Sequence, residues 1–381
     1  MSNLVDYLRW RGDLSLTERD FNPVDNLILS VLAYTDLGGI VPDEGSIRLE
    51  DAAARYVAEG RDQSYLPCDP KETLLAAAAS PRFRNARLSA YVDQVDQEKE
   101  LQFSAMTFTL DDDSVYVAYR GTDNSIVGWR EDFNMSLRET PGQLLAVEYL
   151  NRNAGEGTAL RVGGHSKGGN FALFAAARCD EAVQRRITRV YNNDGPGFLR
   201  AFVETEEYRR ILDRLELLRP ETSLIGILLR SGIEGRVVRS DASGFLQHDP
   251  YTWQVLGTDF ETVEDRSGTS HFVDETLQQW LDRLSDTELE HFVSAVFDSL
   301  EGSGVTTLRE LNANWTVTYN AVLKAASDME PETQKDFFRA LVSLAATGTG
   351  MIWTEAKKSL DRWGKEHLNQ AEDKKDENTE Q

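Results

Sequence analysis

One five-residue turn constrains the fold of this chain more than any other feature of its sequence. The segment Gly164-His165-Ser166-Lys167-Gly168 follows a short apolar run and leads into a stretch of small and apolar residues. This order predicts a strand, a tight turn and a helix. In such a Gly-x-Ser-x-Gly turn the serine occupies a strained bend, and the glycines stand where the backbone packs too closely for a Cβ atom. The start of the helix supplies N–H groups and a positive dipole end, which makes Ser166 a candidate nucleophile.

The segments on either side of this turn predict an α/β fold with a mostly parallel central sheet. Strands are expected over 88–95, 101–110, 114–119, 159–163, 186–192, 215–218 and 236–240. Helices are expected over 26–34, 69–80, 143–151, 167–178, 204–214 and 285–300. Strands that alternate with helices form largely parallel sheets with helices on both faces, and the antiparallel start makes this sheet mixed.

The same pattern divides the chain into four parts. A helical N-terminal segment, 1–80, is expected to pack on an α/β core, 81–268. A C-terminal helical region, 269–368, is expected to form either a packed cap or a surface for a protein partner. The polar tail, 369–381, contains a single alanine as its only apolar residue and is expected to be disordered.

Composition narrows the classes of partner and the compartment. The net charge of −23 disfavours nucleic acid and anionic membrane surfaces. The longest weakly polar run, 341–353, is too short to span a bilayer, and the first residues do not resemble a signal peptide. Cys68 and Cys179 are far apart and suit reduced thiols. We therefore expect a cytoplasmic protein with no membrane span and no nucleic-acid partner.

A serine nucleophile needs a base, and five histidines are available. His248 lies in the loop after the strand 236–240, and loops after parallel strands line the active end of such sheets. His248 is therefore the preferred base, with His271 as the second choice. Structural or surface roles are expected for the others, which are His165, His291 and His367. The side chain of His165 is predicted to point away from Ser166.

The acid that orients the base has more than one candidate. Asp194 ends the strand 186–192 in a turn rich in glycine and proline, at the sheet edge expected for Ser166. It could also be a turn residue bonded to its own backbone. Asp241, seven residues before His248, is the alternative acid, and Glu221 is a distant third.

An oxyanion hole requires two backbone N–H groups aimed at the developing negative charge. One is expected from Lys167, the residue after the nucleophile, and the other from the loop after an earlier strand. The loop after 114–119 contains Thr122, whose hydroxyl could add a further hydrogen bond. The alternative is that this segment is an ordinary polar turn.

Four separated motifs carry a resemblance to a known family. Ala118 to Thr122, followed by Trp129 and Asp132, looks like the oxyanion strand of class 3 (fungal-type) lipases. Together with the serine turn, the segment 192–198 and the segment 247–250, the pattern is similar to the Mbeg-like bacterial α/β-hydrolases over roughly residues 20–260. This resemblance implies an α/β-hydrolase fold more firmly than it implies a substrate.

One departure from class 3 lipases bears on the choice of acid. The acid of those lipases usually follows the strand after the one that leads to Asp194. Here that region, 217–223, contains no aspartate. The departure favours an acid that has shifted to Asp194.

The leading functional hypothesis is a serine hydrolase, similar to an esterase or lipase, that cleaves a small-molecule or lipid ester with an apolar acyl group. It would need no metal and no organic cofactor. An acceptor alcohol or amine would turn the same machinery into an acyltransferase.

A hydrolase-like scaffold that recruits a protein partner through the C-terminal helices is the alternative from another class. A nucleotide-binding module is disfavoured because the glycine-rich turn lacks both phosphate-binding spacings.

Overall fold

The computed structural model describes most of the first 263 residues and one later helix. The described residues are 2–61, 70–96, 101–122, 132, 135, 138–155, 159–198, 200–221, 233–242, 244–263, 285–302 and 324. The chain divides into two compact units. Most of the first is the segment Met1–Glu264, and the second contains α12 (Asp286–Gly302). The predicted boundaries at residues 80 and 268 stay predictions, and the tail 369–381 lies outside the described residues.

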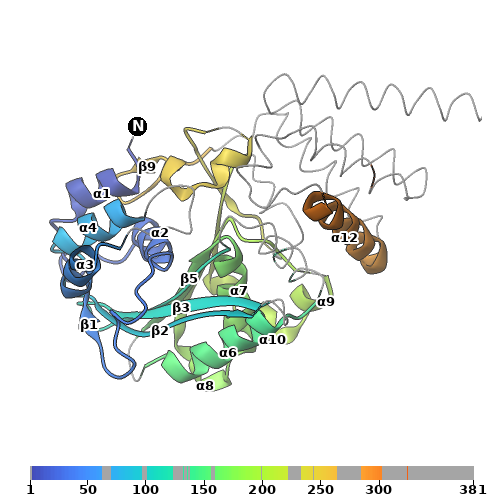
Figure 1. The fold of residues 1–381 in the computed structure, drawn as a ribbon, viewed down its shortest axis with the longest axis horizontal. Helices are drawn as coiled ribbons and strands as arrows, with labels where there is room; N and C mark the ends of the chain where they lie inside the picture. Colours follow the sequence, from blue (N-terminus) through green and yellow to red (C-terminus); the bar gives the residue numbers. More distant parts are fainter. Residues whose placement is uncertain are drawn as a thin grey trace, which may run out of the picture. The chain divides into compact units, whose positions relative to one another are not determined.

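A sheet of eight described strands forms the centre of the first unit (Figure 1). Its order follows the chain: β1 (Ile47–Arg48), β2 (Arg87–Asp96), β3 (Leu101–Thr109), β4 (Val115–Tyr119), β5 (Leu160–His165), β6 (Ile187–Asn193), β7 (Leu215–Pro220) and β8 (Arg236–Val238). The pairs from β1 to β4 are antiparallel, and those from β4 to β8 are parallel. This is the mixed, mostly parallel sheet of an α/β-hydrolase-like fold, as the sequence predicted.

Helices cover both faces of this sheet. The helices of one layer are α1 (Leu4–Arg11), α2 (Pro23–Leu32), α3 (Leu49–Ala58) and α4 (Lys71–Ala79). The other layer contains α6 (Pro141–Asn153), α7 (Lys167–Arg178), α8 (Glu181–Arg186), α9 (Arg200–Val203) and α10 (Glu206–Arg209). Two apolar clusters fill the spaces between the layers. Leu27 of α2 and Phe108 of β3 belong to one cluster, and Val162 of β5 and Phe171 of α7 belong to the other.

Helix α2 begins earlier than the sequence pattern indicated, at Pro23 instead of Asn26. The side chain of Asn22 accepts hydrogen bonds from the N–H groups of Val24 and Asp25, and Asp25 accepts one from the N–H of Asn22 in return. This capping box satisfies N–H groups that the first turn leaves unpaired, and proline suits the first helical position. The apolar run alone marks the helix from Asn26 onward and misses its first turn.

The helix expected over 204–214 is wrong as a single element. The chain forms α10 over four residues, capped by the Thr205 hydroxyl, and then a 3-10 turn, η1 (Leu212–Arg214). Tyr208 and Ile211 are both buried, and the tighter turn brings the chain directly into β7 at Leu215. By contrast, Ser285 and Glu288 form the capping contacts that were expected at the start of α12.

The segment after β8 ends the described part of the first unit. It contains two short 3-10 turns, η2 (Gly244–His248) and η3 (Pro250–Thr252), and a small antiparallel pair, β9 (Val255–Leu256) with β10 (Asp259–Phe260). The Trp253 side chain in this segment is fully buried, and its indole N–H donates to the carbonyl of Gln247 at 2.8 Å. This bond anchors η2, which carries His248.

Candidate active site

Ser166 occupies the strained bend that the sequence predicted. It lies between β5 and α7 with φ 58° and ψ −131°, a conformation that non-glycine residues rarely adopt. Its backbone N–H donates to the carbonyl of Asn193 at 2.9 Å, which fixes the bend to the end of β6. A Cβ atom on Gly168 would lie 2.0 Å from the backbone oxygen of Tyr119. The glycine is therefore required for α7 to pack this closely on β4.

Asp194 and His248 form the central pair of the site. Asp194 directly follows β6, adopts φ 55° and is fully buried. Its Oδ2 lies 2.7 Å from Nδ1 of His248, whose side chain is 18% exposed. Because a carboxylate only accepts hydrogen bonds, the Nδ1 atom carries the proton and Nε2 keeps a lone pair. The chain thus brings together the preferred acid and the preferred base.

The other candidates for acid and base take different positions. The Oδ1 atom of Asp241 accepts a hydrogen bond from the Gln254 amide at 2.5 Å, and the Asp241 N–H donates to the carbonyl of Thr252. Glu221 follows the last residue of β7. His291 is an exposed residue of α12, whereas His271 and His367 lie outside the described residues.

His165 is buried and supports His248. Burial, and then the proximity of the His248 imidazole, hold the pKa of His165 well below its usual value, so its ring is neutral. Its Nε2 lies 2.8 Å from the backbone carbonyl of His248, which can only accept, so Nε2 donates. Nδ1 then accepts from the Tyr34 hydroxyl at 3.1 Å. The ring centroids of the two histidines are 4.6 Å apart. The structural role predicted for His165 thus includes a contact with His248, the preferred candidate for the base, that the sequence did not reveal.

The loop after β4 lies against Ser166. A Cβ atom on Gly121 would be 3.0 Å from Cβ of Ser166, so the backbone at Gly121 touches the serine. The hydroxyl of the next residue, Thr122, donates to the Asp132 carboxylate at 2.5 and 2.7 Å. This bond holds the loop that was expected to supply one oxyanion donor. The spacing of Thr122 and Asp132 was visible in the sequence, but it did not identify their contact.

Lys167 joins the same cluster through its side chain. The side chain is fully buried, and Nζ lies 3.6 Å from Oδ1 of Asp132. Nζ also donates to Oε1 of Gln102 at 3.3 Å. Burial raises the pKa of Asp132, and the Lys167 ammonium opposes that shift. The sequence had indicated a role for the Lys167 backbone and none for its side chain.

The described residues were also searched for metal-ion sites and membrane-spanning helices. Among them, no three His, Cys, Asp or Glu side chains are grouped so that they could hold a metal ion. A search of the same residues finds no helix with the length and apolar character that crossing a membrane requires.

The fold defines an α/β-hydrolase-like protein, and the comparisons with known proteins identify the family. A family model described as Mbeg1-like matches residues 77–298, more than half of the chain. The chain therefore belongs to the Mbeg1-like family. No curated protein matches it. Among solved structures, the chain is similar to a Rhizomucor miehei lipase in its propeptide complex. The two are 17% identical with a TM-score of 0.33, over 63% of this chain and 73% of the lipase chain.

Proposed function

We propose that this protein is a serine hydrolase that cleaves a carboxylic ester through Ser166, His248 and Asp194. The observation that carries the proposal is the 2.7 Å contact between buried Asp194 and Nδ1 of His248. It leaves Nε2 of the imidazole able to accept a proton. The strained backbone of Ser166 supports the same assignment, since strain of this kind is typical of nucleophile turns.

The reaction then proceeds in two balanced halves. The Oγ atom of Ser166 attacks the carbonyl carbon of the ester, and its proton passes to Nε2 of His248. The carbonyl oxygen becomes an oxyanion, for which we assign the backbone N–H groups of Thr122 and Lys167 as donors. Collapse of this intermediate breaks the ester C–O bond, and the leaving alcohol takes the proton from Nε2. Water repeats these steps on the acyl-enzyme and releases the carboxylic acid.

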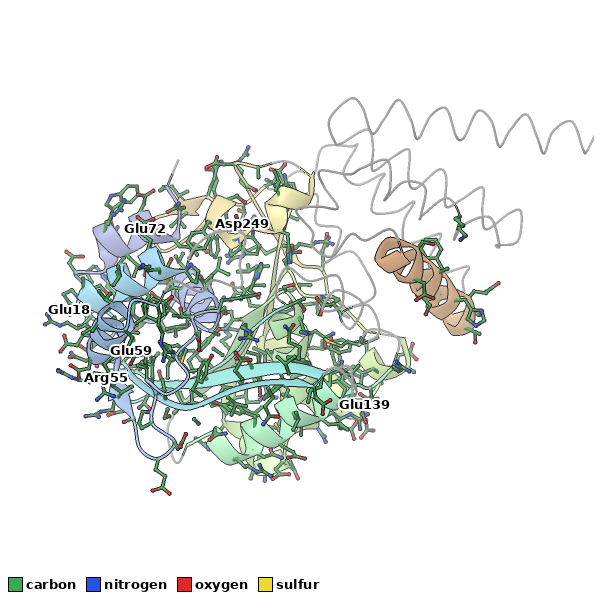
Figure 2. All side chains as sticks on the ribbon, in the orientation of Figure 1. Glu18, Arg55, Glu59, Glu72, Glu139 and Asp249 are labelled. Atoms are coloured by element: carbon green, nitrogen blue, oxygen red, sulfur yellow. The ribbon has the colours of Figure 1, made fainter. Side chains whose placement is uncertain are left out.

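A partly apolar cavity beside α7 supports the choice of an apolar acyl group. It has a volume of about 250 Å³, and its lining combines the apolar Met135, Phe174, Phe198, Ala201 and Phe202 with the polar or charged Arg138, Glu139, Gln143, Arg178 and Thr205. Gln143 also lines it and donates to the Asn170 side chain, one helical turn after Ser166. Glu139, which also lines the cavity, is exposed to solvent (Figure 2). Apolar side chains with a few polar groups are typical of ligand pockets.

A chain-length series of nitrophenyl esters tests this function. We expect the wild type to hydrolyse them with a preference set by acyl length, and Ser166→Ala to reduce turnover to the background rate. His248→Ala should lower kcat about 10⁶-fold. His291→Ala is the matched control, because His291 is exposed on α12, and it should keep wild-type turnover. Equal rates for the wild type and Ser166→Ala would refute the proposal.

A further inference from the structure

A buried carboxylate lies beside the loop to which we assign the oxyanion hole. Asp132 is 4% exposed and holds the Thr122 hydroxyl with both of its oxygens. The Thr122 hydroxyl bonds directly to this carboxylate, and the backbone N–H of the same residue is assigned to the oxyanion. In a buried site two negative charges repel each other far more strongly than in water. A carboxylate here fixes the loop but opposes the charge that develops in the transition state.

The Lys167 side chain supplies a compensating positive charge. Its ammonium lies 3.6 Å from Asp132, and it also contacts the Gln102 oxygen at 3.3 Å and the Phe171 ring, whose centroid is 5.9 Å away. Burial of a lysine costs several kcal/mol unless its charge is paired, and Asp132 is a partner of opposite charge for this fully buried lysine. Lys167, the residue directly after Ser166, therefore places its ammonium beside Asp132, the carboxylate that accepts from Thr122 among the described residues.

We propose that the Lys167 side chain is a positioning residue that neutralises Asp132 and so allows Asp132 to hold Thr122 without opposing the oxyanion. This inference rests on the proposed function, because it assigns an oxyanion to the site. Lys167 then contributes twice: its backbone N–H contacts the oxyanion, and its side chain cancels the charge behind the second donor. Asp132 also interacts electrostatically with His248. Its negative charge would therefore act on both the assigned oxyanion donors and the assigned base.

The substitution Lys167→Met isolates the side chain, because it keeps the backbone N–H and a similar volume. We expect kcat for a nitrophenyl ester to fall about 100-fold, comparable with the loss of one oxyanion donor, while KM stays within about threefold. The rate of inactivation by a fluorophosphonate should fall in parallel. Lys167→Gln, which retains polar hydrogen atoms for Gln102 and Asp132, provides a second uncharged variant with the same expected loss if the methionine variant folds poorly.

The double variant Lys167→Met with Asp132→Asn separates charge cancellation from a purely structural role. It removes both charges and keeps an oxygen that can accept from Thr122, so its kcat should exceed that of Lys167→Met at least about tenfold. Lys71→Met on α4 is the control for loss of a lysine elsewhere and should match the wild type.

The outcomes distinguish this inference from the proposed function. Unchanged kcat in both Lys167→Met and Lys167→Gln, or a double variant no more active than Lys167→Met, would overturn the role of the side chain and leave the function intact. A wild type no more active than Ser166→Ala would overturn both.

Discussion

Replacement of Asp194 by asparagine should remove activity and preserve the fold. Asparagine tolerates the left-handed conformation that Asp194 adopts at φ 55°, and it keeps the backbone N–H that donates to Leu218 at 2.7 Å. It also leaves no unpaired charge in this fully buried position. Exchange of the carboxylate bond to His248 for a neutral amide bond should therefore change the free energy of unfolding by only about 1 kcal/mol.

The kinetic effect should be much larger than the effect on stability. Asparagine can present an N–H to Nδ1 of His248, which selects the tautomer with its proton on Nε2 and removes the base. A swap of this kind costs about 10⁴-fold in kcat, or about 5 kcal/mol of barrier. Turnover of a nitrophenyl ester and urea unfolding, measured on the same preparation, check both expectations.

Asp241→Asn is the matched control for this change. Asp241 bonds to Gln254, and asparagine can retain an oxygen acceptor there. We expect kcat to stay within about threefold of the wild type, since no proton-transfer step involves this carboxylate. The assignment of the acid is wrong if Asp194→Asn retains kcat within tenfold, or if Asp241→Asn loses as much activity as Asp194→Asn.

Two further predictions concern stability. The fold keeps His165 neutral, so the unfolded chain binds an extra proton below pH 6.5, and stability is lost as the pH falls. If the His165 ring stays neutral in the folded protein, the free energy of unfolding should fall by about 2 kcal/mol between pH 7 and pH 5. Urea unfolding should show that His165→Gln removes this loss, whereas the exposed-site control His291→Gln does not. An equal loss in the wild type and His165→Gln would contradict this. Gly168→Ala should lower the free energy of unfolding by about 3 kcal/mol, because its Cβ would meet the backbone oxygen of Tyr119 at 2.0 Å; a wild-type urea midpoint would refute the packing argument.

The sequence predicted the parts of the site that depend on local pattern. Strand, turn and helix around Ser166 follow from a short apolar run, two glycines and a small-residue helix, all within about twenty positions. The largely parallel sheet with helices on both faces followed from the alternation of strands and helices. The helix over 204–214 failed because the burial of Tyr208 and Ile211 and the entry into β7 depend on tertiary packing, which overrides local propensity.

Side-chain contacts between residues that are far apart in the sequence could not be predicted from the local sequence pattern. Asp194 and Asp241 both follow strands, and only the left-handed turn at Asp194 directs its carboxylate to His248. The contact of Lys167 with Asp132 joins residues from two separate elements, and no periodicity reports it. The support of the site by the N-terminal helix α2 was also missed, although the Asn26 amide donates to the Asn193 side chain at 2.8 Å beside the nucleophile turn.

The proposed reaction requires Ser166 to be a nucleophile activated by His248 and Asp194. Incubation of the purified protein with a fluorophosphonate probe, followed by identification of the modified peptide by mass spectrometry, tests it directly. We expect one probe on Ser166, no labelling of Ser166→Ala, and labelling of His248→Ala that is slower by orders of magnitude. A folded wild type that takes up no probe, or equal labelling of the wild type and Ser166→Ala, would show that Ser166 is not the nucleophile.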